Sequence, residues 1–262
     1  MAKYEASRAD AHPAVDRNGQ GAAEGTSDRV KSASLCPVRS GVDWDEAVRL
    51  ARGVAPEADL MGDEDWTALA VWSAIHGVSV RGNNSAGTWR DVEDPGVQFV
   101  PDPRPGKLSL AGSGHDPAWG KGIDLTTHTG MEAGVSDLNG NLEEWTYDLE
   151  VVGGPGQVGT YAVRGVDTGI RVPVGGGGAT AIRSLSTAPA LRRLGVPATV
   201  GVDGLPAFGL DHAVHDGATG VRIMRGGGFY DVERAGIWHM HLTRRHDFSH
   251  VYFGFRPVLR YR

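Results

Sequence analysis

Residues 225–257 read RGGGFYDVERAGIWHMHLTRRHDFSHVYFGFRP, and this stretch decides which fold and function the sequence predicts. From Arg225 to its last residue the chain holds 8 of its 19 aromatic residues and 4 of its 10 histidines. Large amphipathic side chains give contact area at a low entropic cost. The composition of this stretch therefore indicates a binding surface rather than a catalytic centre.

Side chains alternate in polarity along residues 236–243. The apolar residues Trp238, Met240 and Leu242 alternate with polar residues that include His239 and His241. Alternation with a period of two is typical of a half-buried strand, because successive side chains point to opposite faces. The pattern predicts that the apolar set packs into the core and that the histidines point outward together.

The residues after this strand lose the period. Residues 244–252 show no alternation and predict an ordered loop, and Phe253 and Phe255 restart a strand whose side chains belong to the core. Arg225 and Arg256 lie in the glycine-rich ends of the stretch. Because a guanidinium group in such a place can satisfy several carbonyl and carboxylate acceptors, both arginines are predicted to be structural.

Two helices are predicted near the N-terminus. The first begins after Asp43, a good N-cap with Glu46 three residues on, and ends at Gly53. The second covers residues 63–77 and has three acidic residues in its first turn, where the helix dipole favours them.

The rest of the chain shows no long helical period. After Gly77, glycine, proline, asparagine and aspartate separate short strand-like runs, and residues 186–196 predict one short helix. The sequence therefore predicts a single α+β domain over residues 1–262, with two helices near the N-terminus, many short antiparallel strands and long loops.

Composition excludes several classes of function. A net charge of −6 argues against nucleic acid as the main partner. No apolar run has the length of a membrane span, and the first residues lack the apolar core of a secretory signal. The single cysteine, Cys36, excludes an internal disulfide framework and a cysteine zinc cluster. The compartment stays open, with a virion or the cytoplasm before release as the alternatives.

Three motifs together resemble one superfamily. Residues 137–145 read DLNGNLEEW and are similar to the G-N-x-x-E-W signature of the formylglycine-generating, sulfatase-modifying factor superfamily. Residues 221–227, VRIMRGG, resemble its R-G-G-S element, and residues 254–256, GFR, resemble its terminal G-F-R. The resemblance covers nearly the whole chain and implies a C-type lectin-like fold.

One branch of that superfamily is more similar: the variable proteins of diversity-generating retroelements. Residues 65–73 and 235–238 resemble this branch, which implies a hypervariable region at about 229–253 that error-prone reverse transcription rewrites at template adenines. The rewritten positions coincide with the outward face and loop that periodicity predicts. These predicted ligand-binding residues are Tyr230, Asp231, Arg234, His239, His241, Thr243, Arg244, Arg245, His246, Asp247, Phe248, His250 and Tyr252.

The predicted function is therefore ligand binding, or receptor recognition, through a diversified C-terminal surface. The aromatic members Tyr230, Phe248 and Tyr252 would serve as anchors, and the arginines of the same set would pair with acidic or carbonyl groups. The expected partner is an unknown protein or cell-surface ligand, with no nucleic acid and no membrane insertion. The resemblance implies a phage, a prophage or a bacterial host as the setting.

Two other functions stay open as alternatives. Oxidases of the formylglycine-generating type place copper-binding cysteines shortly after the R-G-G-S element, whereas residues 228–234 contain none. Cys36 lies far upstream and is expected to be a small buried or loop thiol. The chain is accordingly predicted not to be an enzyme, and an undiversified phage tail component is the remaining alternative.

No cofactor is predicted, and two metal alternatives remain. A metal ion could in principle gather the C-terminal histidines, namely His239, His241, His246 and His250. A His-x-His pair places both rings on one face of a strand, although no carboxylate spacing supports a geometry. A structural calcium ion is the second alternative, with oxygen ligands from Asn139, Asn141 and Glu144.

Overall fold

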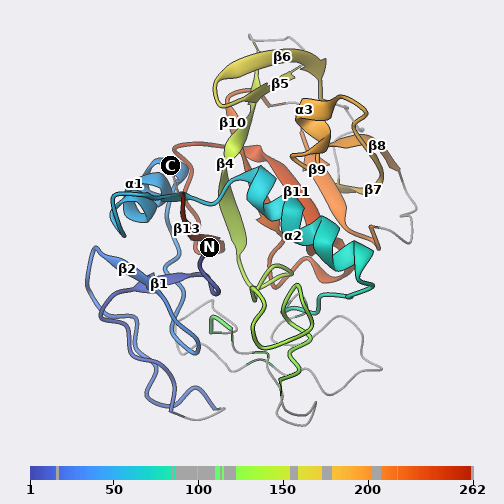
Figure 1. Ribbon diagram of the computed structural model, residues 1–262. Coiled ribbons are helices and arrows are strands. Elements are labelled where there is room, and N and C mark those ends of the chain that lie inside the picture. Colours follow the sequence, from blue (N-terminus) through green and yellow to red (C-terminus); the bar gives the residue numbers. More distant parts are fainter. Residues whose placement is uncertain are drawn as a thin grey trace.

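One mixed sheet dominates the computed structural model (Figure 1). The structure describes residues 1–15, 18–83, 85, 99, 110–112, 114, 122–153, 159–172, 179–201, 208–216 and 218–260. The sheet has nine strands. Eight follow one another in space in the order β6 (Val166–Arg171), β5 (Thr160–Val163), β4 (Glu143–Val152), β10 (Val221–Gly226), β11 (Gly236–Arg245), β9 (His212–His215), β7 (Ala179–Leu185) and β8 (Pro197–Gly201). The ninth, β12 (Phe253–Phe255), pairs with β4.

This sheet corrects the predicted fold class. The predicted fold class, an α+β, C-type lectin-like fold with two helices near the N-terminus and many short antiparallel strands, is wrong for this chain. Strands hold more than twice as many residues as helices, and nine strands form one curled sheet. The pairings of β11 with β9 and of β12 with β4 are parallel. The two ten-residue strands, β4 and β11, lie on either side of β10 and form the middle of the sheet.

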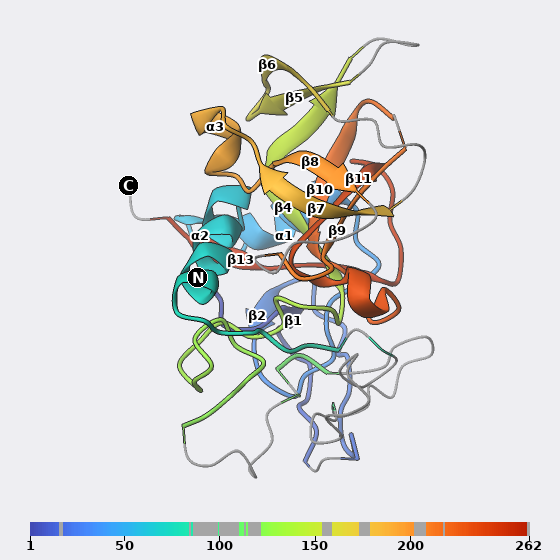
Figure 2. The same cartoon turned by 90° about the vertical axis from the view of Figure 1, so that its right-hand side faces the viewer.

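Helices occur at the three predicted places. In α1 (Trp44–Arg52) the Asp43 carboxylate accepts a hydrogen bond from the backbone N–H of Glu46 at 2.8 Å, and Gly53 is the C-cap. Helix α2 (Asp63–Ile75) lies against one face of the sheet, as Figures 1 and 2 show. The short α3 (Pro189–Arg192) falls inside the predicted segment. None of the described helices is long and apolar enough to cross a membrane.

Two small sheets complete the described structure. Strand β1 (Ala6–Arg8) pairs with β2 (Val30–Ser32), and β3 (Ala58–Leu60) pairs with β13 (Pro257–Leu259). The second pairing brings the last described strand next to the segment between α1 and α2. The backbone N–H of Ala2 also donates to the carbonyl of Pro257 at 3.1 Å, so the N-terminal residues lie beside this strand.

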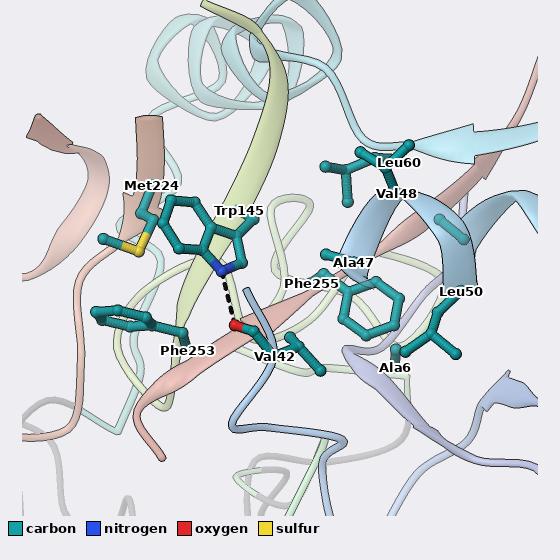
Figure 3. Close-up of a cluster of buried hydrophobic side chains, with 11 residues drawn as sticks. Ala6, Val42, Ala47, Val48, Leu50, Leu60, Trp145, Met224, Phe253 and Phe255 are labelled. Atoms are coloured by element: carbon teal, nitrogen blue, oxygen red, sulfur yellow. Dashed lines mark hydrogen bonds between the residues drawn. The ribbon is translucent and has the colours of Figure 1, made fainter. Parts of the chain in front are cut away.

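The core is built around Trp145 of β4 (Figure 3). Its ring meets Phe253 edge to face at a centroid distance of 5.4 Å, and its Nε1–H donates to the carbonyl of Val42 at 3.0 Å. A neighbouring cluster contains Met240 and Leu242 of β11. The prediction of a buried apolar set is confirmed for Trp238, Met240, Leu242, Phe253 and Phe255.

Both predicted structural arginines form buried ion pairs. Arg225 Nε lies 2.8 Å from Asp63 Oδ1, and Arg256 Nη2 lies 2.6 Å from Glu144 Oε1. Arg256 also donates to the carbonyls of Lys3 and Ser136. A buried charge needs a partner of opposite charge, so each pair fixes the relative position of distant segments.

Candidate functional site

The predicted ligand-binding residues lie on one continuous part of the structure. The 3-10 helix η2 (Val232–Arg234) leads into β11, and residues 246–252 form the loop that follows it. Seven of the thirteen side chains are exposed: Tyr230, Arg234, Arg245, His246, Asp247, Phe248 and His250. Four are half-buried: Asp231, Thr243, Arg244 and Tyr252.

The other two, His239 and His241, are buried. Their residues are 1% and 9% exposed, so the prediction that they point outward into solvent is wrong. The reason is that residues 227–235 fold back over this face of β11. The backbone carbonyl of Arg234 lies 2.9 Å from Nδ1 of His239 and accepts its proton. Alternation along a strand reports which residues share a face, but not whether another segment covers that face.

Four rings of this set lie together, and we call them the aromatic surface: the exposed Tyr230, Phe248 and His250, and the half-buried Tyr252. Centroid distances are 4.9 Å between Tyr230 and Tyr252, 4.4 Å between His250 and Tyr252, and 6.4 Å between Phe248 and His250. Tyr230 is 42% exposed and Phe248 is 40% exposed. Exposed large rings at such spacing are a feature of binding surfaces.

The loop that carries most of the aromatic surface is tied to the start of α1. The carbonyl of His246 accepts from the backbone N–H of Trp44 at 2.9 Å, and the carbonyl of His250 accepts from Gly41 at 3.1 Å. His246 Nδ1 also lies 2.6 Å from a carboxylate oxygen of Asp45. These contacts explain why an ordered loop forms without a period of its own.

Arginines flank the aromatic surface. The Arg244 guanidinium lies 5.0 Å from the Phe248 ring centroid, a cation–π distance. Arg245 pairs with Asp247 at 3.5 Å, and both side chains are more than half exposed. Arg234 is exposed at the end of η2. The surface therefore offers both apolar area and cationic hydrogen-bond donors.

A polar cluster lies directly beneath Tyr230. Glu143 of β4 accepts a hydrogen bond from the Tyr230 hydroxyl at 2.8 Å through Oε1, and its Oε2 lies 2.7 Å from Nδ1 of His241. The other ring nitrogen of His241 lies 2.6 Å from the Thr243 hydroxyl. One ligand atom from each of Glu143, His239 and His241 lies within 4.8 Å of the others. We call these three residues the His–Glu cluster.

No sequence pattern marks Glu143 as a residue of the site. It lies inside the 137–145 motif, where Glu144 is the glutamate that the motif selects. Glu143 and His241 are separated by 98 residues, so no spacing rule connects them. The pairing of β10 with both β4 and β11 brings them together.

Burial and mutual charge shift the acidity of the groups in this region. Burial alone would raise the pKa of Glu143, but His241, His239 and the Tyr230 hydroxyl outweigh it, and the pKa lies below its ordinary value. The pKa of Asp231 is raised, chiefly by burial and also by the nearby Glu143. Burial, together with the negative charge of Glu143, also raises the pKa of Tyr230. The groups around Glu143 thus stabilise the ionised form of its buried carboxylate.

His239 has one ring nitrogen without a partner. Its Nδ1–H donates to the Arg234 carbonyl, whereas its buried Nε2 makes no hydrogen bond. An unsatisfied buried polar atom costs about 1–3 kcal/mol. Such an atom in a native protein calls for an explanation, such as a bound water or ion.

Of the three residues in the calcium alternative, Glu144 already has a cationic partner. Both carboxylate oxygens of Glu144 accept from Arg256. The side-chain amide nitrogen of Asn139 donates to the carbonyl of Val80 at 2.7 Å, and that of Asn141 donates to Glu5. A guanidinium group already supplies the positive charge that a calcium ion would bring.

The oxidase alternative gains no support from Cys36. The residue is buried, as expected, and burial raises the pKa of its thiol. The thiolate is the nucleophile and metal ligand, so a raised pKa disfavours both roles.

A separate cleft of about 370 Å³ lies where the end of α2 approaches β11. Phe208 and Trp238, whose rings meet edge to face, form its apolar wall, and Asp211 and Asn139 contribute polar atoms. None of the thirteen predicted ligand-binding residues lines this cleft. The aromatic surface is therefore a surface feature and not the mouth of this cleft.

Comparison with known proteins gives no independent assignment. No protein-family model matches the chain, and no curated protein has a significantly similar sequence.

Proposed function

We propose that this chain is a ligand-binding protein that recognises its partner through the aromatic surface and the arginines beside it. One observation carries the proposal: the exposed rings of Tyr230, Phe248 and His250 group with the half-buried Tyr252. Three of these four rings lie on the 246–252 loop, which is hydrogen-bonded to the scaffold. Rigid aromatic side chains bind at a low entropic cost, because few torsions remain to be fixed.

The chemistry of the surface favours an acidic or carbonyl-rich partner. Arg234 and Arg245 are exposed, and guanidinium groups bind carboxylates and carbonyls with directional hydrogen bonds. A protein or a cell-surface glycan that carries acidic groups has this chemistry. The aromatic rings would provide the apolar contact and the arginines the orientation.

We also propose that the exposed part of the surface is the part that varies in sequence. The resemblance to variable proteins of diversity-generating retroelements supports this, as does the position of residues 245–250 outside the core. Substitution at exposed positions usually changes stability by less than about 0.5 kcal/mol. The buried His239 and His241 do not share that tolerance, so the proposed variable set excludes them.

A binding experiment tests recognition. The purified chain carries a fluorescent label and is incubated with a panel of bacterial cells, and bound fluorescence is measured by flow cytometry. Binding to some strains is expected, with loss of at least about tenfold in affinity for Phe248→Ala combined with His250→Ala, because aromatic anchors contribute about 2 kcal/mol or more. Ile75→Ala is the matched control, since Ile75 is 75% exposed on α2.

Two outcomes would count against the proposal. Equal binding by the double variant and the parent would show that another surface carries recognition.

Genomic sequence tests variation separately. A second copy of the coding segment for residues 229–253, differing mainly at adenines and lying beside a reverse transcriptase gene, is expected. If neither were present, the diversification proposal would fail while recognition could stand.

A further inference from the structure

Glu143 differs from the other buried carboxylates that form ion pairs in this fold. Asp63 and Glu144 each face a buried arginine, and Asp148 faces the partly exposed Arg164. Within the part of the chain that the structure describes, the ion-pair partner of Glu143 is the imidazole ring of His241, at 2.7 Å, rather than an arginine. An ionised carboxylate at 1% exposure is stable only with a positive charge nearby. A bound cation would therefore stabilise the buried Glu143 carboxylate.

The two histidines present ring nitrogens to the same space. The bond from Nδ1 of His239 to the Arg234 carbonyl fixes the tautomer, so that Nε2 keeps its lone pair and has no partner. His241 has Nδ1 toward Glu143 and Nε2 toward the Thr243 hydroxyl. Histidines that bind metals generally use one ring nitrogen for the ion and hold the other by such an outer hydrogen bond.

We propose that Glu143, His239 and His241 bind a divalent transition-metal ion of the zinc class. Two imidazoles and one carboxylate are donors that zinc accepts, and their ligand atoms already lie within 4.8 Å of one another. Nε2 of His239, Nδ1 of His241 and Oε2 of Glu143 are the binding atoms. When the ion enters, it replaces the Nδ1 proton of the His241 imidazolium, that proton leaves to solvent, and the remaining Nε2–H donates a hydrogen bond to the Thr243 hydroxyl.

Metal binding would connect the interior of the sheet to the aromatic surface. Glu143 lies on β4 and both histidines lie on β11, while Tyr230 donates to the free carboxylate oxygen from above. Three protein donors leave at least one coordination position for water or for a group of a bound partner. The ion would hold Tyr230 through Glu143 and so make the surface more rigid.

Calorimetry with zinc tests the site directly. The full chain is freed of metal with a chelator, titrated with Zn²⁺, dialysed and analysed for metal content. One zinc per chain is expected. His239→Ala and Glu143→Gln are expected to lose stoichiometric binding. The exposed His246→Ala and His250→Ala are matched controls that remove a histidine from the neighbouring loop, and they are expected to bind zinc as the parent does.

Two further measurements keep the proposal testable if the core variants fold poorly. Thr243→Val removes only the hydroxyl that contacts His241, and it is expected to weaken zinc binding about 10–100-fold while the circular dichroism spectrum stays unchanged. Co²⁺ in the parent protein is expected to give visible d–d absorption that zinc displaces. Absence of stoichiometric binding in the parent, or parent-like binding by a folded His239→Ala variant, would overturn the proposal.

Discussion

Arg256 and Glu144 form a two-point ion pair at the centre of the fold, with Nη2 to Oε1 at 2.6 Å and Nε to Oε2 at 3.2 Å. Their side chains are 0% and 1% exposed. Burial raises the pKa of Glu144, and the positive charge of Arg256 opposes that shift. The pair lies where β12 runs alongside β4, so it joins the C-terminal strand to the middle of the sheet.

Replacing Arg256 with methionine is expected to destabilise the chain by about 3–5 kcal/mol, because Glu144 is left buried without its partner. Urea denaturation followed by tryptophan fluorescence measures the change. Arg245→Ala is the control, since its ion pair with Asp247 is exposed and its loss should cost less than about 0.5 kcal/mol. Similar effects of the two variants would show that the Arg256 pair has no special role.

The raised pKa of Asp137 predicts that the free energy of unfolding depends on pH. Burial raises the pKa of Asp137 to about 7, although Arg256 and the N–H of Gly112 pull it down. A carboxyl group whose pKa is raised in the folded state binds protons more tightly when folded. Its contribution is therefore fully present below about pH 4 and is lost as pH rises toward 7.

Asp137→Asn should consequently remove part of that pH dependence. Denaturation midpoints of parent and variant are compared between pH 4 and 8. The free energy of unfolding of the variant, relative to that of the parent, is expected to rise with pH by an amount on the order of a few kcal/mol. The exposed Asp247→Asn is the control and should leave the pH profile unchanged. A parallel profile for Asp137→Asn and the parent would mean that Asp137 titrates normally.

The sequence predicted the local features of the fold well and its long-range features poorly. The Asp43 cap and the core set of Trp238 and Met240 follow from spacing within one element, and both are present. The fold class failed because it depends on how distant strands pair, as in the parallel pairing of β9 with β11, and such pairings leave no spacing in the sequence. Strand β6 is a largely exposed edge, and β7 pairs with β8 through register shifts.

For the candidate site, too, the sequence predicted the local features and missed the long-range contacts. Exposure of residues 245–250 was predictable, because a polar run without a period rarely packs in a core. Burial of His239 and His241 depends on the path of residues 227–235, and the partner Glu143 comes from β4. Neither relationship leaves a spacing in the sequence, since both arise from the pairing of distant strands.

The turn that covers the histidines depends on Gly227. This residue has φ of +71°, and a Cβ atom there would lie 2.7 Å from Cα of Ala235. Gly227→Ala is expected to destabilise the chain by about 3 kcal/mol, from backbone strain together with the steric clash. Gly165→Ala is the matched control, because Gly165 has φ of +81° with nothing within 4 Å, and it should cost only about 1–2 kcal/mol. Equal costs in thermal or urea denaturation would remove the argument for a tight turn.

Residues of the scaffold and of the recognition surface should respond differently to substitution. Met240 is fully buried in β11, and Phe248 is 40% exposed on the following loop. Met240→Ala should cost about 2–5 kcal/mol in urea denaturation, because it leaves a cavity among well-packed side chains. Phe248→Ala should cost less than about 1 kcal/mol and yet reduce binding to cells, because its ring contributes contact area to a partner rather than to the core. A large loss of stability in Phe248→Ala would show that the aromatic surface is part of the scaffold, and the proposed recognition role would then lose its structural basis.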